Sequence, residues 1–148
     1  LSMIAKNCDA SVPIPGPFES DDKALQAQTM ALLDILREKM EIQAFNEVLE
    51  SIWSVIRAAN AYVDRQAPWK LKKDDPVRMA TVLYVLADNI RQLAILTQSF
   101  MPDSSCNLLE QLGVDETRRD FQAFSEPLLP GAALPKPRGV FPRFHESE

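Results

Sequence analysis

Three long stretches of this 148-residue chain repeat apolar side chains at steps of three and four residues, and this feature constrains the fold most. An amphipathic helix has this period because one turn holds about 3.6 residues. The helices are expected over 20–40, 42–66 and 76–100, with these apolar stripes: Leu25, Thr29, Leu32, Leu33, Leu36 and Met40; Phe45, Leu49, Ile52, Ile56, Ala59 and Val63; Met79, Val82, Leu83, Leu86, Ile90, Leu93 and Phe100. Trp53 lies beside the second stripe and is expected in the core.

Prolines and polar caps define where the predicted helices begin and end. Pro68 ends the second helix and pushes Ala67 towards an extended backbone. Asp75 is expected as the N-cap of the third helix, with Pro76 at its first position. Asp21 and Asp22 suit the positive end of the first helix, which begins near Ser20.

Shorter elements are expected on either side of the long helices. Residues 1–7 read as the end of a helix, and residues 8–19 as a proline-rich loop that packs on the bundle through Val12, Ile14 and Phe18. A short helix over 102–112 should end at Gly113, and another is expected over 116–121 after an Asp115 cap. Five prolines after residue 125 predict an extended tail, held on the bundle by apolar side chains: Leu128, Leu129, Leu134, Val140, Phe141 and Phe144.

The sequence therefore predicts an all-α fold, a bundle of three long antiparallel helices plus short helices and an extended Pro-rich C-terminal tail. The short connection near Glu41 favours antiparallel packing of the first two helices. The domain boundaries expected are 1–126 for the helical bundle and 127–148 for the extended segment packed on it. No apolar run approaches the ~18 residues of a membrane span, so no membrane is expected as a partner.

Residues for catalysis or metal binding are not recognisable in the sequence. Cys8, Cys106 and the single histidine, His145, have no metal-ligand spacing, and the cysteines are expected to be free cytosolic thiols. No Gly-rich phosphate loop follows a strand. The net charge of −5 speaks against non-specific coating of nucleic acid, although a local basic edge remains compatible with it.

Such a basic edge surrounds the proline corner after the second helix. Between Arg57 and Arg78 the chain carries Arg57, Arg65, Lys70, Lys72, Lys73 and Arg78 against three aspartates. Trp69 follows Pro68 directly and is expected on a corner outside both neighbouring helices. Either it covers the bundle end as a lid with its indole N–H bonded, or it is a platform on which a base stacks while the lysines hold phosphates.

This corner resembles the anticodon-binding helical domain of methionyl-tRNA synthetases, of bacterial type. In that family, a helix ending in Asn-x-Tyr-(Ile/Val)-(Asp/Glu)-x-x-x-Pro-Trp-x-Leu leads through a basic corner into another helix. The residues that match are Asn60, Tyr62, Val63, Asp64, Pro68, Trp69 and Leu71. The likeness continues through Leu128-Leu129-Pro130-Gly131 and Lys136-Pro137 to Phe141-Pro142-Arg143, so it covers most of the chain.

The resemblance implies tRNA as the partner, both the initiator and the elongator methionine tRNA. The cytosine of the CAU anticodon would stack on Trp69, which Pro68 orients, and phosphates would lie near Lys70, Lys72 and Lys73. Asn60 is a further candidate near the corner. The parent enzyme would ligate methionine to its tRNA in the cytoplasm, as an expected monomer. ATP, with zinc as an optional metal, would belong to its catalytic part, and this chain alone, with no cofactor, should be inactive.

The resemblance also implies a gap. In the family, an Asn and an Arg one turn apart on the first helix of the bundle read the edge of the cytosine, and no such pair precedes Leu1-Ser2-Met3-Ile4. The chain is thus expected to be an N-terminally truncated fragment that binds anticodon stem-loops weakly and with little discrimination. The alternative is a helical protein-protein interaction module with no RNA role. A helical-bundle metal enzyme fails because a Glu-x-x-His pair is lacking.

Overall fold

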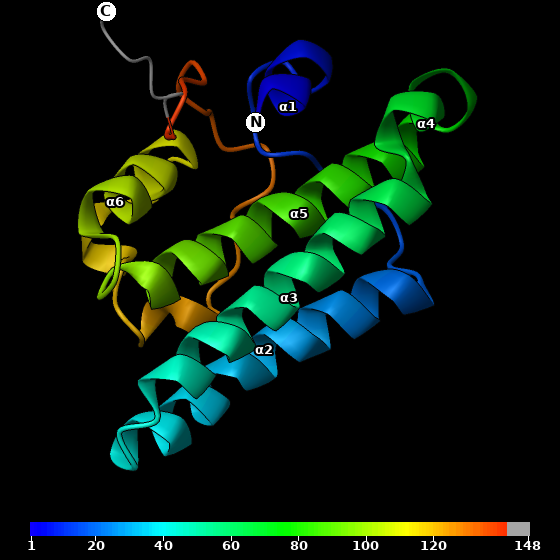
Figure 1. The fold of residues 1–148 in the computed structure, drawn as a ribbon. Helices are drawn as coiled ribbons and strands as arrows, with labels where there is room; N and C mark the ends of the chain where they lie inside the picture. Colours follow the sequence, from blue (N-terminus) through cyan, green and yellow to red (C-terminus); the bar gives the residue numbers. More distant parts are fainter. Residues whose placement is uncertain (142–148) are drawn as a thin grey trace, which may run out of the picture.

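The computed structural model describes residues 1–141 and shows three long helices lying side by side (Figure 1). Each of the three contains 22 residues, and α2 and α3 form an antiparallel hairpin against which α5 packs. The described α-helices are α1 (Ser2–Asn7), α2 (Ser20–Glu41), α3 (Phe45–Gln66), α4 (Pro68–Asp74), α5 (Pro76–Thr97) and α6 (Pro102–Gln111). The predicted all-α bundle is confirmed.

The predicted starts of α2 and α5 agree with the observed caps, whereas α3 begins at Phe45 instead of 42 and α5 ends at Thr97 instead of 100. The side chain of Asp75 accepts a hydrogen bond from the Arg78 N–H at 2.9 Å, and Pro76 is the first residue of α5. Glu19 is the N-cap of α2, where Glu19 and Asp22 each accept a hydrogen bond from the backbone N–H of the other. Such reciprocal bonds satisfy two N–H groups that the first helical turn leaves free.

The predicted core face of α3 is wrong in part. Its buried residues are Val48, Ile52, Val55, Ala59 and Tyr62. Phe45 and Trp53, both expected inside, are 52% and 51% exposed. The reason is that α3 carries apolar residues on two adjacent faces, and only one of them packs against α2 and α5. Leu86, Ile90 and Leu93 of α5 are likewise only half-buried, and Met40 and Phe100 are exposed.

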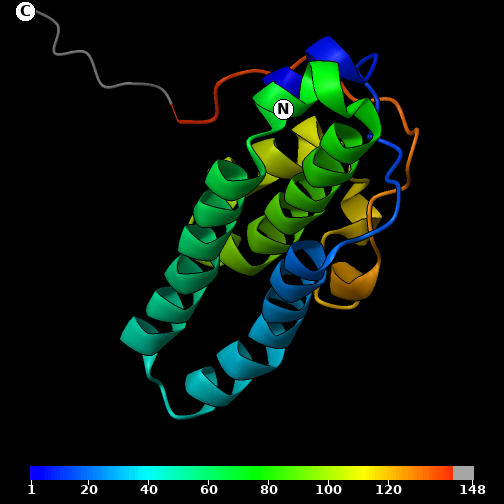
Figure 2. The same cartoon turned by 90° about the vertical axis from the view of Figure 1, so that its right-hand side faces the viewer.

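The proline-rich segments at the two ends of the chain run alongside each other (Figure 2). The Val12 N–H donates to the Ala132 carbonyl, and the Gly131 N–H donates to the Val12 carbonyl, both at 2.8 Å. The Tyr84 hydroxyl donates to the carbonyl of buried Leu128 at 2.9 Å, which ties the tail to α5. The expected packing of Ile14, Leu129 and Phe141 is wrong, because all three are exposed; Phe144 lies outside the described residues.

The short elements after α5 are close to those predicted. Gly113, with φ +66°, follows the end of α6 in the left-handed conformation that glycine tolerates. The Asp115 cap is confirmed, since its side chain accepts the Thr117 N–H, but the helix that follows is one 3-10 turn, Glu116–Arg118. A second 3-10 turn, Ala123–Ser125, is not predicted from the sequence.

The most apolar of the described helices is α5. By length and composition it alone among them would be able to cross a membrane, but 78% of its most apolar 18-residue window is buried inside the bundle. Burial of this extent is typical of the central helix of a helical bundle, and α5 contacts α2, α3, α4 and α6. The hydropathy of α5 is therefore explained by its place in the core.

Candidate nucleic-acid interface

The corner between α3 and α5 is built on a left-handed residue and a short helix, α4. Ala67 has φ 43° and ψ 58°; its N–H still bonds the Val63 carbonyl at 2.9 Å, and its carbonyl accepts the Lys70 N–H at 2.8 Å. Two expectations are therefore wrong: Ala67 is left-handed, not extended, and Trp69 is the second residue of a helix. A left-handed residue ends α3 and reverses the chain in one step, after which Pro68 can begin the next helix.

Trp69 is held at the surface by its buried neighbours. Pro68 is buried, and Leu71 is half-buried against both hydrophobic clusters of the core. Trp69 itself is 52% exposed, so about half of its surface faces solvent. The helix is thus attached to the bundle by Pro68 and Leu71, and it presents the indole outwards.

The lysines of α4 gather around this indole. Lys72 and Lys73 stand three and four residues after Trp69, which places them on its face of the helix, and Lys70 is its neighbour. All three are exposed, and within residues 1–141 none of their side chains forms a hydrogen bond or an ion pair. By contrast, Arg57, Arg65 and Arg78 pair with carboxylates: Glu50, Asp21 and Asp22. The unpaired positive charge of the corner therefore belongs to α4.

Asn60, the remaining candidate, lies elsewhere. It is on α3, six residues before its end, or ~9 Å along the axis at 1.5 Å per residue. There it lines an apolar groove of ≈ 460 Å³ between α3 and α5. The groove is walled by Leu1, Ile4, Trp53, Ile56, Ala59, Val63, Leu83, Leu86, Ile90, Leu93, Leu108 and Phe141, among others. Pro68, Trp69 and the three lysines thus share α4, whereas Asn60 lies on α3 and lines the groove.

A buried polar cluster beneath the corner was not recognised in the sequence. Asp22 of α2 is fully buried, and both its carboxylate oxygens accept hydrogen bonds from Arg78 of α5, at 2.5 and 2.8 Å. The Tyr62 hydroxyl donates to the same carboxylate at 2.6 Å, and Arg78 also donates to Gln66 Oε1 at 2.7 Å. Figure 1 shows that α2 begins, α3 ends and α5 begins at this one end of the bundle, next to α4.

The electrostatics of the cluster favour its charged form. Burial by itself would raise the pKa of Asp22, but hydrogen bonds from Arg78, Tyr62 and the Glu19 N–H outweigh it and hold that pKa below its usual range. The hydrogen bond to Asp22 raises the pKa of Arg78. Burial, followed by the bond to the Asp22 carboxylate, raises the pKa of Tyr62, so this hydroxyl remains a donor. These three donors satisfy the hydrogen-bonding capacity of the Asp22 carboxylate, so it is not free to act as an acid or a base.

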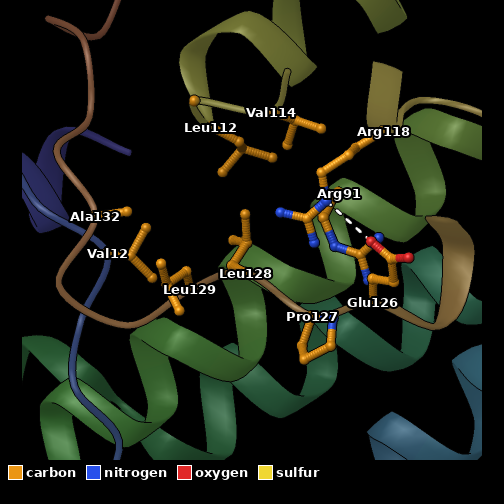
Figure 3. A pocket seen from close by; sticks show the side chains of 11 residues that line it. Val12, Arg91, Leu112, Val114, Arg118, Glu126, Pro127, Leu128, Leu129 and Ala132 are labelled. Atoms are coloured by element: carbon orange, nitrogen blue, oxygen red, sulfur yellow. Dashed lines mark hydrogen bonds and ion pairs between the residues drawn. The ribbon is translucent and has the colours of Figure 1, made fainter. Parts of the chain in front are cut away.

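A smaller hollow of ≈ 210 Å³ lies where the tail crosses α5, and each charged side chain that lines it has a partner (Figure 3). Arg91, 2% exposed, donates to Asp88 and to the carbonyls of Ala123 and Phe124. Arg118 pairs with Glu126 across the rim, the contact drawn as a dashed line in Figure 3. We interpret this hollow as the junction of tail and bundle. Among the described residues, no three His, Cys, Asp or Glu side chains are grouped to hold a metal ion.

Comparison with known proteins shows the family to which the sequence is similar. The family model described as "Anticodon binding domain of methionyl tRNA ligase" matches residues 12–148. Methionine–tRNA ligase of Brucella suis is 45% identical over 149 residues, covering 100% of this chain and 29% of that protein. The Rhizobium meliloti ligase is 47% identical and is covered over 28% of its length. The chain thus spans less than a third of the curated relatives it matches.

A solved structure shows the same fold. The apo form of Mycobacterium tuberculosis methionyl-tRNA synthetase is similar with a TM-score of 0.95 and 42% identity, covering 99% of this chain and 30% of that one. The family match extends over far more than half of the sequence, and the structural likeness extends over nearly all of it. The chain therefore belongs to the family of anticodon-binding domains of methionyl-tRNA ligases.

Proposed function

We propose that this chain binds the anticodon loop of methionine tRNA, with Trp69 as the stacking surface. The observation that carries the proposal is the arrangement of α4, where a half-exposed indole shares one helical face with Lys72 and Lys73. Unpaired bases of an RNA loop are commonly recognised by stacking on an aromatic ring. A lid covering the bundle end would have most of its ring inside the core, whereas Trp69 keeps about half of its surface open.

The parts of α4 have separate roles in this proposal. Stacking on Trp69 contributes about 1–3 kcal/mol, and it tolerates any base. Lys70, Lys72 and Lys73 contact phosphates, which adds affinity without sequence information. Pro68 restricts the start of α4, so that less freedom is lost when the RNA binds. Discrimination of the CAU anticodon then depends on groups that reach the edge of the base, and Asn60 remains a candidate for such a group.

The whole protein, in this proposal, is a cytoplasmic, monomeric methionine–tRNA ligase that serves both initiator and elongator tRNA. The M. tuberculosis synthetase, solved in complex with methionyl-adenylate and 42% identical to this chain, supports the ligase activity in this proposal. ATP and methionine, with zinc as an optional metal, would be bound by the catalytic part. The residues of this chain contribute tRNA binding and not the ligation itself.

A titration of fluorescently labelled stem-loops tests the proposal. A CAU anticodon stem-loop should bind the chain in a salt-dependent manner, with log K falling linearly with log salt concentration. A loop-free RNA duplex and a generic acidic protein of similar charge are the controls, since neither offers an unstacked base. Equal affinity for all three, or no binding at low salt, would overturn the assignment to RNA.

The apolar groove favours a second proposal, that this face of α3 and α5 contacts protein. The groove holds Trp53, Ile56 and Val63 against Leu86 and Ile90, and surfaces of this kind mark interaction sites. Because the chain spans less than a third of its relatives, we infer that the rest of a longer synthetase covers it. Hydrogen exchange of α3 should then be slower in the full-length protein than in this chain. Unchanged exchange would indicate that a separate protein, and not the rest of the synthetase, binds the groove.

A further inference from the structure

We infer that the buried cluster of Asp22, Tyr62, Gln66 and Arg78 is a positioning network that fixes the direction of Trp69. The inference rests on the proposed function, because it concerns how the stacking surface is held and not whether it binds RNA. None of the four side chains belongs to α4, and none is a candidate for contact with the RNA. They act through the helix ends on either side of α4.

Both ends of the segment that carries Trp69 are tied to this network. Gln66 is the last residue of α3 and lies two positions before Pro68; its amide oxygen accepts from Arg78 and its amide nitrogen donates to Asp21 at 3.2 Å. On the other side, Asp75 follows α4 directly and accepts the Arg78 N–H. Arg78 therefore bonds a residue just before α4 through its guanidinium, and a residue just after α4 through its backbone N–H, as the N-cap bond of α5.

Ala67 gives an independent reason for such a support. A non-glycine residue in the left-handed region is strained, and strained backbone persists only where the surrounding structure over-determines it. Ala67 stands between Gln66, which the network holds, and Pro68, which is buried in the core. The strain falls on the one residue whose φ and ψ decide how α4 leaves α3. Because Gln66 and Pro68 are both held, they determine the direction in which α4 carries the Trp69 side chain.

The network divides into two parts that can be altered separately. The ion pair of Asp22 and Arg78 joins α2 to α5 and holds the bundle together. Tyr62 and Gln66 attach the end of α3 to that pair, each through one hydrogen bond. Removing these two attachments leaves the ion pair intact. Gln66→Met also removes the bond from the Gln66 amide to Asp21, so the two changes together release the end of α3, from which α4 continues. The inference therefore predicts a local effect at Trp69 from Tyr62→Phe and Gln66→Met.

The test compares this pair of changes with a matched control. Tyr84→Phe also removes a buried tyrosine hydroxyl bond, but that bond joins α5 to Leu128 of the tail. All variants carry Trp53→Phe, so that Trp69 is the only tryptophan of the chain. Fluorescence anisotropy and iodide quenching of Trp69, thermal unfolding, and affinity for the CAU stem-loop are measured for each.

We expect the Tyr62→Phe, Gln66→Met double variant to lower the anisotropy of Trp69 and to weaken stem-loop binding by roughly three- to tenfold, the scale of one or two hydrogen bonds. Tyr84→Phe, which removes a single buried hydrogen bond, should lower the melting temperature and leave both other quantities unchanged. Unchanged anisotropy in the double variant, or an equal change in Tyr84→Phe, would overturn the inference. If Trp69→Ala binds as well as the parent chain, the proposed function fails instead, and the anisotropy alone decides the positioning role.

Discussion

The two tryptophans of this chain are almost equally exposed, Trp53 at 51% and Trp69 at 52%, yet their surroundings differ completely. Trp53 stands in the middle of α3, in the wall of an apolar groove. Trp69 stands on α4, a helix of seven residues, among three lysines and above a buried ion pair. Exposure alone therefore does not assign a role to an aromatic ring, whereas the charge and polarity of its neighbours do.

The two sites also differ in how they are held. Trp53 belongs to a 22-residue helix that is held by packing against α2 and α5. Trp69 depends on a left-handed residue, a buried proline and a hydrogen-bond network that joins three long helices. An aromatic ring on a surface of two long helices suits contact with another protein segment. A ring fixed on a short charged corner suits a small planar ligand such as a base.

The largest effect is expected from Arg78→Met, which removes the support of Trp69 and leaves Trp53 untouched. It leaves Asp22 buried without its cation, and breaking a buried pair in this way costs about 3–5 kcal/mol. Urea unfolding followed by circular dichroism measures the loss. Arg57→Met is the control on α3, since the ion pair with Glu50 is exposed and should contribute at most about 1 kcal/mol. Similar losses in the two variants would contradict the difference drawn between the regions.

Trp69→Ala should have the next largest effect, on binding and not on stability. Loss of one base stack weakens affinity by about 1–3 kcal/mol, or about five- to 150-fold. The melting temperature should change little, since half of the ring is already in water. Trp53→Ala is the matched control and should leave stem-loop affinity unaltered. If Trp53→Ala weakens binding as much as Trp69→Ala does, the groove and not the corner is the RNA surface.

A smaller effect is expected from replacing Lys70, Lys72 and Lys73 together by glutamine. Each phosphate contact to a single strand contributes about 0.7 to the slope of log K against log salt, so the slope should become shallower by about 2. The measurement is a stem-loop titration at several potassium chloride concentrations. Lys39→Gln, at the opposite end of α2 and paired with Glu47, should leave the slope unchanged. An unaltered slope in the triple variant would show that the three lysines do not contact phosphates of the RNA.

The smallest effect is expected from protonation of Asp22, which lowers the stability of the fold only at acid pH. The pKa of Asp22 is lowered in the folded state, so between that value and the unfolded value of about 3.9 the unfolded chain binds more protons. The stability from Asp22 is therefore complete above pH ~4 and is lost as the pH falls through the folded pKa. Unfolding midpoints measured from pH 6 down to 2 should show this decline, and Asp22→Asn should flatten it. A variant with the same acid profile as the parent would show that other carboxylates cause the decline.

Much of the corner was predictable from residues close together in the sequence. Asp75 followed by Pro76 indicates a helix start, and Pro68 after an apolar stripe indicates a helix end; both are confirmed. The sequence did not predict that Ala67 would be left-handed, because the residue before a proline usually prefers an extended backbone. Here the need to end α3 and begin α4 at once outweighs that preference.

The faces of α3 were harder to predict. Phe45, Leu49 and Trp53 continue the apolar period as well as Val48, Ile52 and Val55 do, so the sequence alone offers two adjacent stripes. Which stripe is buried depends on where α2 and α5 lie. Arg78, one of the basic residues that the sequence places around the corner, is only 9% exposed and is bonded to Asp22. Burial of an arginine is not expected without a partner, and its partner is 56 residues away.

The sequence by itself determined the fold class, the three long helices, most of their ends, and the Pro68-Trp69 corner with its lysines. These features depend on interactions within about four residues of the chain, between neighbours that the sequence lists side by side. The tertiary structure decided which face of α3 is buried, that Asn60 lines the groove between α3 and α5, and that Asp22, Tyr62, Gln66 and Arg78 meet at the end of the bundle next to α4. Such meetings join residues up to 56 positions apart, and only the packing of whole helices brings them together.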